Sequence, residues 1–193
     1  MSVIIPTINE AMHIEETLKS VARQHTSFNF EIIVCDGGSK DNTIEIARKY
    51  ARVAVSLMQG TGAQLDFAAN LSKGKILVFL DADTLLPEGY LQRVYESFKR
   101  NMSLLACGAP FGYNGRKRCR IRLGKISSTI TEYVLVNLAM YLWYVSRDIF
   151  HFTEIPGCNF CIRRYIYFKV GGFKRFPSIP VDIALSSAIR ELI

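Results

Sequence analysis

The sequence predicts an α/β fold in which a central, mostly parallel sheet carries helices on both faces. Three observations indicate this fold. Strand-like and helix-like patterns alternate over roughly the first 100 residues. Between Lys75 and Asp81 lies an unbroken run of five apolar residues, which is typical of a strand buried on both faces. The length of 193 residues suits one domain with its own hydrophobic core.

The individual elements follow from the spacing of apolar residues and from the residues that interrupt them. Strands are expected at 3–5, 30–35, 53–57, 75–80 and 103–109. The first helix is expected over residues 14–22, because Ile14, Leu18, Val21 and Ala22 recur at helical spacing. Further helices are expected over about 41–50, from the Gly60-Thr-Gly62 break to about residue 72, and after Pro87. Ser39 or Asp41 is the expected cap of the second helix.

The second half of the chain is less regular. Six cations and no acid lie between Tyr113 and Lys125, which we interpret as a cationic loop. An uncharged apolar stretch follows from Tyr133 to Ser146, and its 14 residues fall short of the ~20 that span a bilayer. Two interpretations stay open. The stretch is a buried core helix, or it attaches the protein, together with the cationic loop, to an anionic membrane face.

The composition favours anionic partners. A net charge of +7 suits phosphates, nucleic acid or acidic lipid headgroups. No motif that reads nucleic acid accompanies the cations, so we expect no nucleic-acid partner. The five cysteines are odd in number and scattered, which favours reduced thiols in the cytosol. The chain opens on a strand pattern without the features of a signal peptide, so we expect a cytoplasmic protein.

Two acidic motifs stand at predicted strand ends, where open α/β sheets bind ligands. Asp81-Ala-Asp83 can hold a hard divalent cation that also binds phosphates, or Asp81 can simply end the strand while Asp83 caps a turn. Asp36-Gly-Gly-Ser39 combines glycines that let a ligand approach the backbone with a carboxylate that can accept hydrogen bonds from a base or ribose. No dinucleotide fingerprint or P-loop is present, and Cys158-x-x-Cys161 lacks the second pair of a zinc site.

The order of the motifs is more specific than any one of them. Along the chain come Pro6-Thr-Ile-Asn9-Glu10, Asp36-Gly-Gly-Ser39, Asp81-Ala-Asp83, Gly157-Cys-Asn159 and Gly171-Gly-Phe173. From Ser2 to about Arg190 this series resembles the family-2 glycosyltransferases, and it most resembles small soluble members in which Phe-Pro-x-Ile-Pro precedes the catalytic acid. The resemblance implies a Rossmann-like nucleotide-diphospho-sugar transferase fold. It also implies a single domain, 1–193, with a donor half at 1–110 and an acceptor half at 111–193.

The resemblance assigns roles to individual residues. In the family, the residues that match Pro6 to Glu10 frame the nucleotide, and the match of Asp36 contacts the base, usually uracil or guanine. Asp81 and Asp83 match the pair that holds Mg²⁺ or Mn²⁺ on the diphosphate, and Asp182 matches the general base. The implied nucleotide-sugar-binding residues are Pro6, Thr7, Asn9, Glu10, Asp36, Gly38, Gly62, Asp66, Asp81 and Ala82.

The implied activity is a metal-dependent, inverting transfer of a sugar from a UDP- or GDP-linked donor to an acceptor hydroxyl or phosphate. A lipid-linked acceptor, with peripheral contact at the inner face of the membrane, is one candidate. Val181 and Ala184 stand where the family usually has acids, and Asp66 stands where it usually has asparagine. These departures leave an alternative, a catalytically impaired nucleotide-sugar-binding protein of the same fold. A nucleotidyltransferase is disfavoured because no Gly-rich loop follows the first strand.

Overall fold

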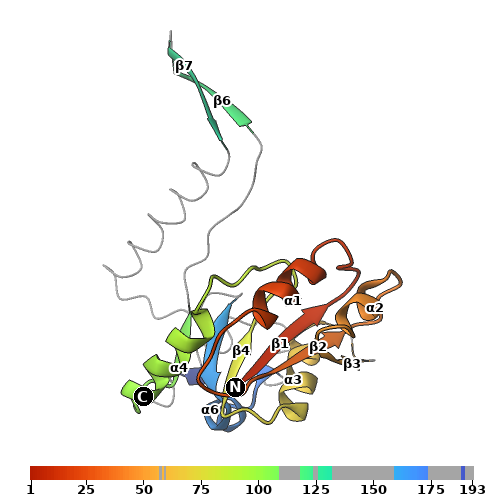
Figure 1. Ribbon diagram of the computed structural model, residues 1–193, viewed down its shortest axis with the longest axis vertical. Coiled ribbons are helices and arrows are strands. Elements are labelled where there is room, and N and C mark those ends of the chain that lie inside the picture. Colours follow the sequence, from red (N-terminus) through yellow and green to blue (C-terminus); the bar gives the residue numbers. More distant parts are fainter. Residues whose placement is uncertain are drawn as a thin grey trace. The chain divides into compact units, whose positions relative to one another are not determined.

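The computed structural model describes residues 1–56, 58, 60–108, 159–173 and 188–189, together with the backbone of 118–123 and 126–131. The chain forms two compact units, one made of Met1–Gly108 and Ile155–Ile193 and the other of Ala109–Glu154. Figure 1 shows the elements of both. None of the helices in these described residues is long and apolar enough to cross a membrane.

The larger unit is built on a six-stranded sheet of order β3-β2-β1-β4-β8-β5. β1 pairs in parallel with β2 and β4, and β2 pairs in parallel with β3. β8 runs antiparallel between β4 and β5. The strands are β1 (Ser2–Thr7), β2 (Glu31–Asp36), β3 (Arg52–Val55), β4 (Ile76–Phe79), β5 (Ala106–Gly108) and β8 (Phe160–Arg163). The expected α/β fold is confirmed, with a single strand reversed.

Helices lie on both faces of this sheet (Figure 1). They are α1 (Ile14–Ala22), α2 (Thr43–Ala47), α3 (Thr61–Leu71), α4 (Tyr90–Arg100) and α6 (Arg164–Lys169). Side chains of a strand alternate between the faces. Leu77 and Phe79 of β4 pack in one core cluster with Leu65 of α3 and Tyr167 of α6, so α3 and α6 cover that face. All four residues of β4 are buried, as its apolar run predicts.

The opposite face is covered by α1 and α4. Cys161 of β8 lies on it, and its Sγ is 3.6 Å from Oη of Tyr90 in α4. Thr17 of α1 donates a hydrogen bond to the carbonyl of Ala82, just after β4, at 2.7 Å. Figure 1 shows α1 and α3 on opposite sides of the sheet. The strand ends are therefore held between two helical layers.

The second helix and third strand differ from their expected bounds. α2 covers Thr43–Ala47 only. It starts late because Asp41 Oδ1 accepts the Thr43 backbone N–H at 3.1 Å and so closes a turn. It ends early because the N–H of Tyr50 reaches back only three residues, to the Ala47 carbonyl at 3.0 Å. The helix begins after Asn42, which makes no side-chain cap, rather than after Ser39 or Asp41. β3 ends at Val55, and residue 57 lies outside the described residues.

The second unit contains an antiparallel pair of strands, β6 (Arg118–Leu123) and β7 (Ile126–Thr131). The interpretation of residues 113–125 as a cationic loop is therefore wrong for the part that forms β6. The missed signal is the alternation of cations with Cys119, Ile121 and Leu123, which has the period of a strand. The apolar stretch 133–146 lies outside the described residues, so both interpretations of it remain open.

Candidate active site

The candidate site lies where the order of strands in the sheet reverses. The chain runs outward from β1 through β2 to β3 and then returns to add β4 on the other side of β1. In open α/β sheets, ligands bind at such a switch point, beyond the carboxyl ends of the strands. The Leu80 N–H donates to the Ile4 carbonyl at 3.0 Å, so β4 and β1 stay paired up to this edge. The loops after β1, β2 and β4 all lie at this carboxyl edge of the sheet.

The loops after β1 and β2 are joined by hydrogen bonds. The Asn9 N–H donates to Ser39 Oγ at 2.8 Å, and the Lys40 N–H donates to Asn9 Oδ1, also at 2.8 Å. The Glu10 N–H donates to Thr43 Oγ1 at 2.8 Å. Each loop thus supplies side-chain acceptors for the backbone of the other. The two motifs that the sequence separates by nearly 30 residues form one preorganised structure.

Asp36 is the buried centre of this structure. Its Oδ1 accepts hydrogen bonds from Thr7 Oγ1 at 3.1 Å and from Ser39 Oγ at 2.5 Å. Its Oδ2 accepts the backbone N–H groups of Gly38 and Ser39, both at 2.8 Å. A carboxylate has about four lone-pair sites, and all four are occupied. Asp36 therefore fixes the glycine turn, and a base N–H can bind it only by displacing one of these donors.

Gln64 of α3 also reaches this structure, and we did not single it out from the sequence. Only 6% of its surface is exposed. Its Nε2 donates to the Thr7 carbonyl at 3.2 Å. A Cβ at Gly37 would lie 2.0 Å from that same Nε2, so only glycine leaves room for the amide. The available signal was a polar residue one helical turn before the buried Ala68.

The Asp81-Ala-Asp83 motif forms a turn directly after β4. The Thr84 N–H donates to the Asp81 carbonyl at 3.2 Å, and Thr17 holds the carbonyl of the buried Ala82. Asp81 is partly exposed and Asp83 is exposed. Two carboxylates fit Mg²⁺ or Mn²⁺, which commonly keep water and phosphate as their other ligands. Among the described residues there is no group of three acidic, cysteine or histidine side chains that would form an all-protein site.

Asp66 points to a different part of the unit. It is buried in α3, and its Oδ1 accepts hydrogen bonds from the Tyr167 hydroxyl and, at 3.0 Å, from the Phe173 N–H. Gly172, with φ +62°, passes so close that a Cβ there would lie 2.5 Å from Oδ1. Burial and the Asp66 carboxylate raise the pKa of Tyr167. These contacts anchor the glycine turn after α6, and donor binding by Asp66 stays a prediction.

The remaining predicted residues are placed as follows. Pro6 lies in β1 opposite Cys35, and Gly62 lies in the first turn of α3. The Glu10 carboxylate is partly exposed, with Oε2 3.4 Å from His13 Nδ1. Asp182 lies outside the described residues. The structure therefore gathers Thr7, Asn9, Glu10, Asp36 and Gly38, with Asp81 to Asp83 in the turn after the adjoining strand β4.

Comparison with known proteins places these features in a family. The model of the family "Glycosyl transferase family 2" matches residues 2–187. A validoxylamine A glucosyltransferase of Streptomyces hygroscopicus is 32% identical over 125 residues, which are 60% of this chain and 30% of that protein. The chain thus spans less than a third of the length of this relative.

Solved structures share the fold. The mannosyltransferase PcManGT from Pyrobaculum calidifontis, in complex with GDP-Man and Mn²⁺, superimposes with a TM-score of 0.68 at 21% identity, covering 96% of this chain and 50% of that one. S. aureus TarS 1–349 in complex with UDP gives a TM-score of 0.68 at 20% identity, covering 97% and 54%. The chain has the A-type fold of these enzymes.

Proposed function

Because this chain belongs to glycosyl transferase family 2, we propose that it transfers a hexose from a UDP- or GDP-linked donor to an acceptor, with inversion and with a divalent metal ion. The observation that carries the proposal is the arrangement at the switch point. Two hydrogen-bonded loops after β1 and β2 adjoin a pair of carboxylates after β4. That arrangement provides a rigid place for a nucleotide beside a place for its diphosphate.

Each side of this edge would have its own task. The loops around Thr7 and Asp36 bind the nucleotide, and Gln64 keeps the Thr7 carbonyl in position. Asp81 and Asp83 would hold Mg²⁺ or Mn²⁺, which neutralises the charge that develops on the departing nucleoside diphosphate. Support for the metal comes from the exposed acidic turn and from the Mn²⁺ in the PcManGT complex.

For the chemical step we propose an in-line displacement. The acceptor oxygen bonds to the anomeric carbon while the bond from that carbon to the diphosphate oxygen breaks. The acceptor proton passes to Asp182 as general base. The support for Asp182 is the family resemblance of its position. The acids usually found at the positions of Val181 and Ala184 are missing, so a nucleotide-sugar-binding protein without transferase activity is the alternative that experiment must exclude.

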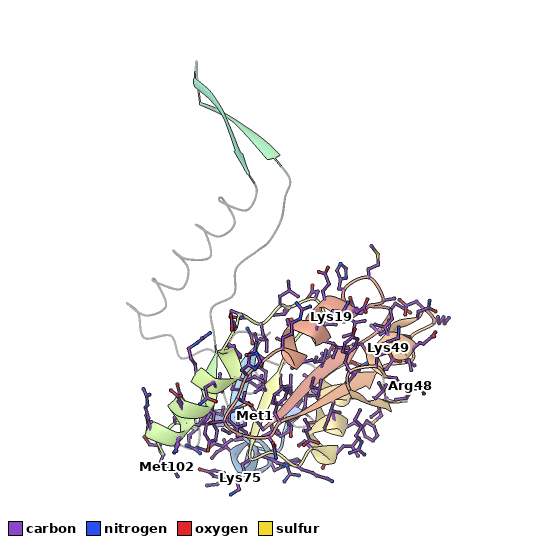
Figure 2. The ribbon with its side chains drawn as sticks, viewed as in Figure 1. Met1, Lys19, Arg48, Lys49, Lys75 and Met102 are labelled. Atoms are coloured by element: carbon purple, nitrogen blue, oxygen red, sulfur yellow. The ribbon has the colours of Figure 1, made fainter. Side chains whose placement is uncertain are left out.

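For the acceptor we propose a hydroxyl or phosphate compound, with a lipid-linked molecule as the first candidate and a cytoplasmic location at the inner membrane face. The support is the net charge of +7. Part of it is on the larger unit, where Arg48 and Lys49 are exposed after α2 and Lys19 lies on α1, the helix that α2 contacts (Figure 2). Co-sedimentation with anionic vesicles at low salt tests this; no binding at any salt concentration contradicts it.

The decisive experiment on the donor site is a thermal-shift titration with UDP and GDP, with and without Mn²⁺. Ligand at 100 times its Kd adds about 2.7 kcal/mol, which raises the Tm by about 5–10 °C for a chain of this size. We expect this shift only with metal present and expect Asp83→Ala to abolish it. Glu88→Ala, an exposed acid five residues further on, is the matched control and should keep the full shift.

Transfer itself is measured as release of nucleoside diphosphate from UDP-glucose, UDP-N-acetylglucosamine and GDP-mannose in the presence of Mn²⁺ and a panel of acceptors. Asp182→Asn should lose turnover and keep donor binding. Metal-independent nucleotide binding contradicts the proposed role of Asp81 and Asp83. Tight donor binding without turnover, unaffected by Asp182→Asn, favours the alternative binding protein.

A further inference from the structure

Asn159 lies beside the candidate metal turn although the sequence places it nearly 80 residues away. β8 pairs antiparallel with β4, and Phe160 stands opposite Phe79. Continuing this register by one residue sets Asn159 opposite Leu80, next to Asp81. The start of β8 therefore lies at the same edge of the sheet as the ends of β1 and β4.

The backbone of Asn159 is in the left-handed region, with φ +62°, and its side chain is buried, with 5% of the residue exposed. Among the described residues, Asn159 Oδ1 is one of two buried side-chain nitrogen or oxygen atoms without a hydrogen-bond partner. The other is Asp66 Oδ2, on the carboxylate whose Oδ1 anchors the turn after α6. A buried carbonyl oxygen without a donor is destabilising, so the presence of asparagine at position 159 needs an explanation.

The left-handed backbone conformation alone does not explain why asparagine stands at position 159. Asparagine adopts the left-handed region readily when its side chain bonds to nearby backbone. Asn9, the other non-glycine residue with positive φ in the described part of the chain, does this: its Oδ1 accepts the Lys40 N–H at 2.8 Å. Asn159 Oδ1 makes no such bond to any residue that the structure describes. Glycine would provide the same φ without burying an unpaired oxygen.

We propose that Asn159 binds a hydroxyl of the donor sugar. Its Oδ1 can only accept a hydrogen bond, so the ligand must carry an O–H or N–H group. Diphosphate oxygens are acceptors and cannot satisfy it. The N–H groups of the base are too distant, because β8 and β2 are three strand spacings apart, about 14 Å. The sugar, attached to the diphosphate beside Asp81, brings hydroxyl donors to this place. The inference rests on the proposed function and names a residue for it.

Isothermal titration in Mn²⁺ tests the inference by comparing two dissociation constants. One is for the nucleotide sugar that the wild-type protein binds among UDP-glucose, UDP-N-acetylglucosamine and GDP-mannose, and the other is for its free nucleoside diphosphate. Asn159→Gly keeps the backbone conformation and removes the amide. We expect about tenfold weaker binding of the nucleotide sugar and less than twofold change for the diphosphate. Asn101→Gly, at an exposed asparagine after α4, should change neither constant.

A second measurement does not depend on the folding of the variant. Among donors that lack one sugar hydroxyl, one should bind the wild-type protein about tenfold more weakly than the parent donor. Equal weakening of nucleotide sugar and diphosphate overturns the inference, because it locates the amide on the metal or diphosphate. Unchanged constants in Asn159→Gly, or equal affinity for every deoxy donor, overturn it as well. If the wild-type protein binds no nucleotide sugar at all, the proposed function itself fails.

Discussion

Replacement of Asp66 should separate a buried anchor from a ligand-binding group. Asp66→Ala removes the acceptor of two buried donors, the Tyr167 hydroxyl and the Phe173 N–H. Leaving a buried donor unpaired costs about 1–3 kcal/mol. Two such donors give about 2–6 kcal/mol, and removal of a buried carboxylate whose Oδ2 has no hydrogen-bond partner among the described residues offsets part of this cost. We expect a net loss of about 2–4 kcal/mol in the free energy of unfolding.

The control is Asp66→Asn, which keeps an oxygen in the place of Oδ1. It should lie within about 1 kcal/mol of the wild-type protein, because the second carboxylate oxygen has no partner to lose among the described residues. Urea unfolding followed by far-UV circular dichroism measures both variants. Equal stability of Asp66→Ala and Asp66→Asn would refute the reasoning. An Asp66→Asn protein of normal stability that binds the donor more weakly would instead support the donor-binding role implied by the family.

Two further predictions concern the contact between Gly37 and Gln64 and the reactivity of two cysteines. Gly37→Ala should push the Gln64 amide off the Thr7 carbonyl, and calorimetry should then show severalfold weaker binding of the nucleoside diphosphate. The same substitution should have a smaller effect in a Gln64→Ala protein. An equal effect in both proteins contradicts the contact. Burial and the neighbouring Asp36 raise the pKa of Cys35 to about 11, whereas a hydrogen bond from Cys161 lowers the pKa of Cys107. At pH 8 a larger fraction of Cys107 than of Cys35 is therefore thiolate. Mass spectrometry after iodoacetamide treatment should find Cys107 alkylated before Cys35. The reverse order contradicts these pKa directions.

Much of the larger unit was predictable because its signals are local. The apolar run of β4 needs burial on both faces, and the structure provides it. Glycines and acids after the strands mark the edge at which the site forms. The short α2 was not predictable from propensity, because the Asp41 turn competes with the first helical hydrogen bonds. β6 was missed because its cations were interpreted by charge alone, although they alternate with apolar residues.

What sequence reasoning could not supply are contacts between distant segments. The hydrogen bonds of Asp36 depend on Thr7 and the Gly38-Ser39 turn lying at the same edge of the sheet. No spacing rule predicts that these four hydrogen bonds occupy all four lone-pair sites of the carboxylate. Gln64 and Asn159 matter only through the register of neighbouring elements. Asp66 was assigned from its place in a motif, whereas its carboxylate accepts hydrogen bonds from the Tyr167 hydroxyl and the Phe173 N–H. Motif order thus located the site, and packing decided what its residues touch.

The position of β8 has a consequence for biosynthesis. β4 and β5 each pair with β8, yet β8 follows β4 in the chain by about 80 residues. The length-dependent part of the entropy cost of closing such a loop is about 4 kcal/mol. Until the ribosome has released Phe160–Arg163, the most apolar strand of the sheet has an open edge. Open apolar edges recruit other chains. Nascent or truncated chains that stop before β8 should therefore depend on chaperones. Pairing of β8 with β4 completes the sheet and covers the edge through which the chain could aggregate.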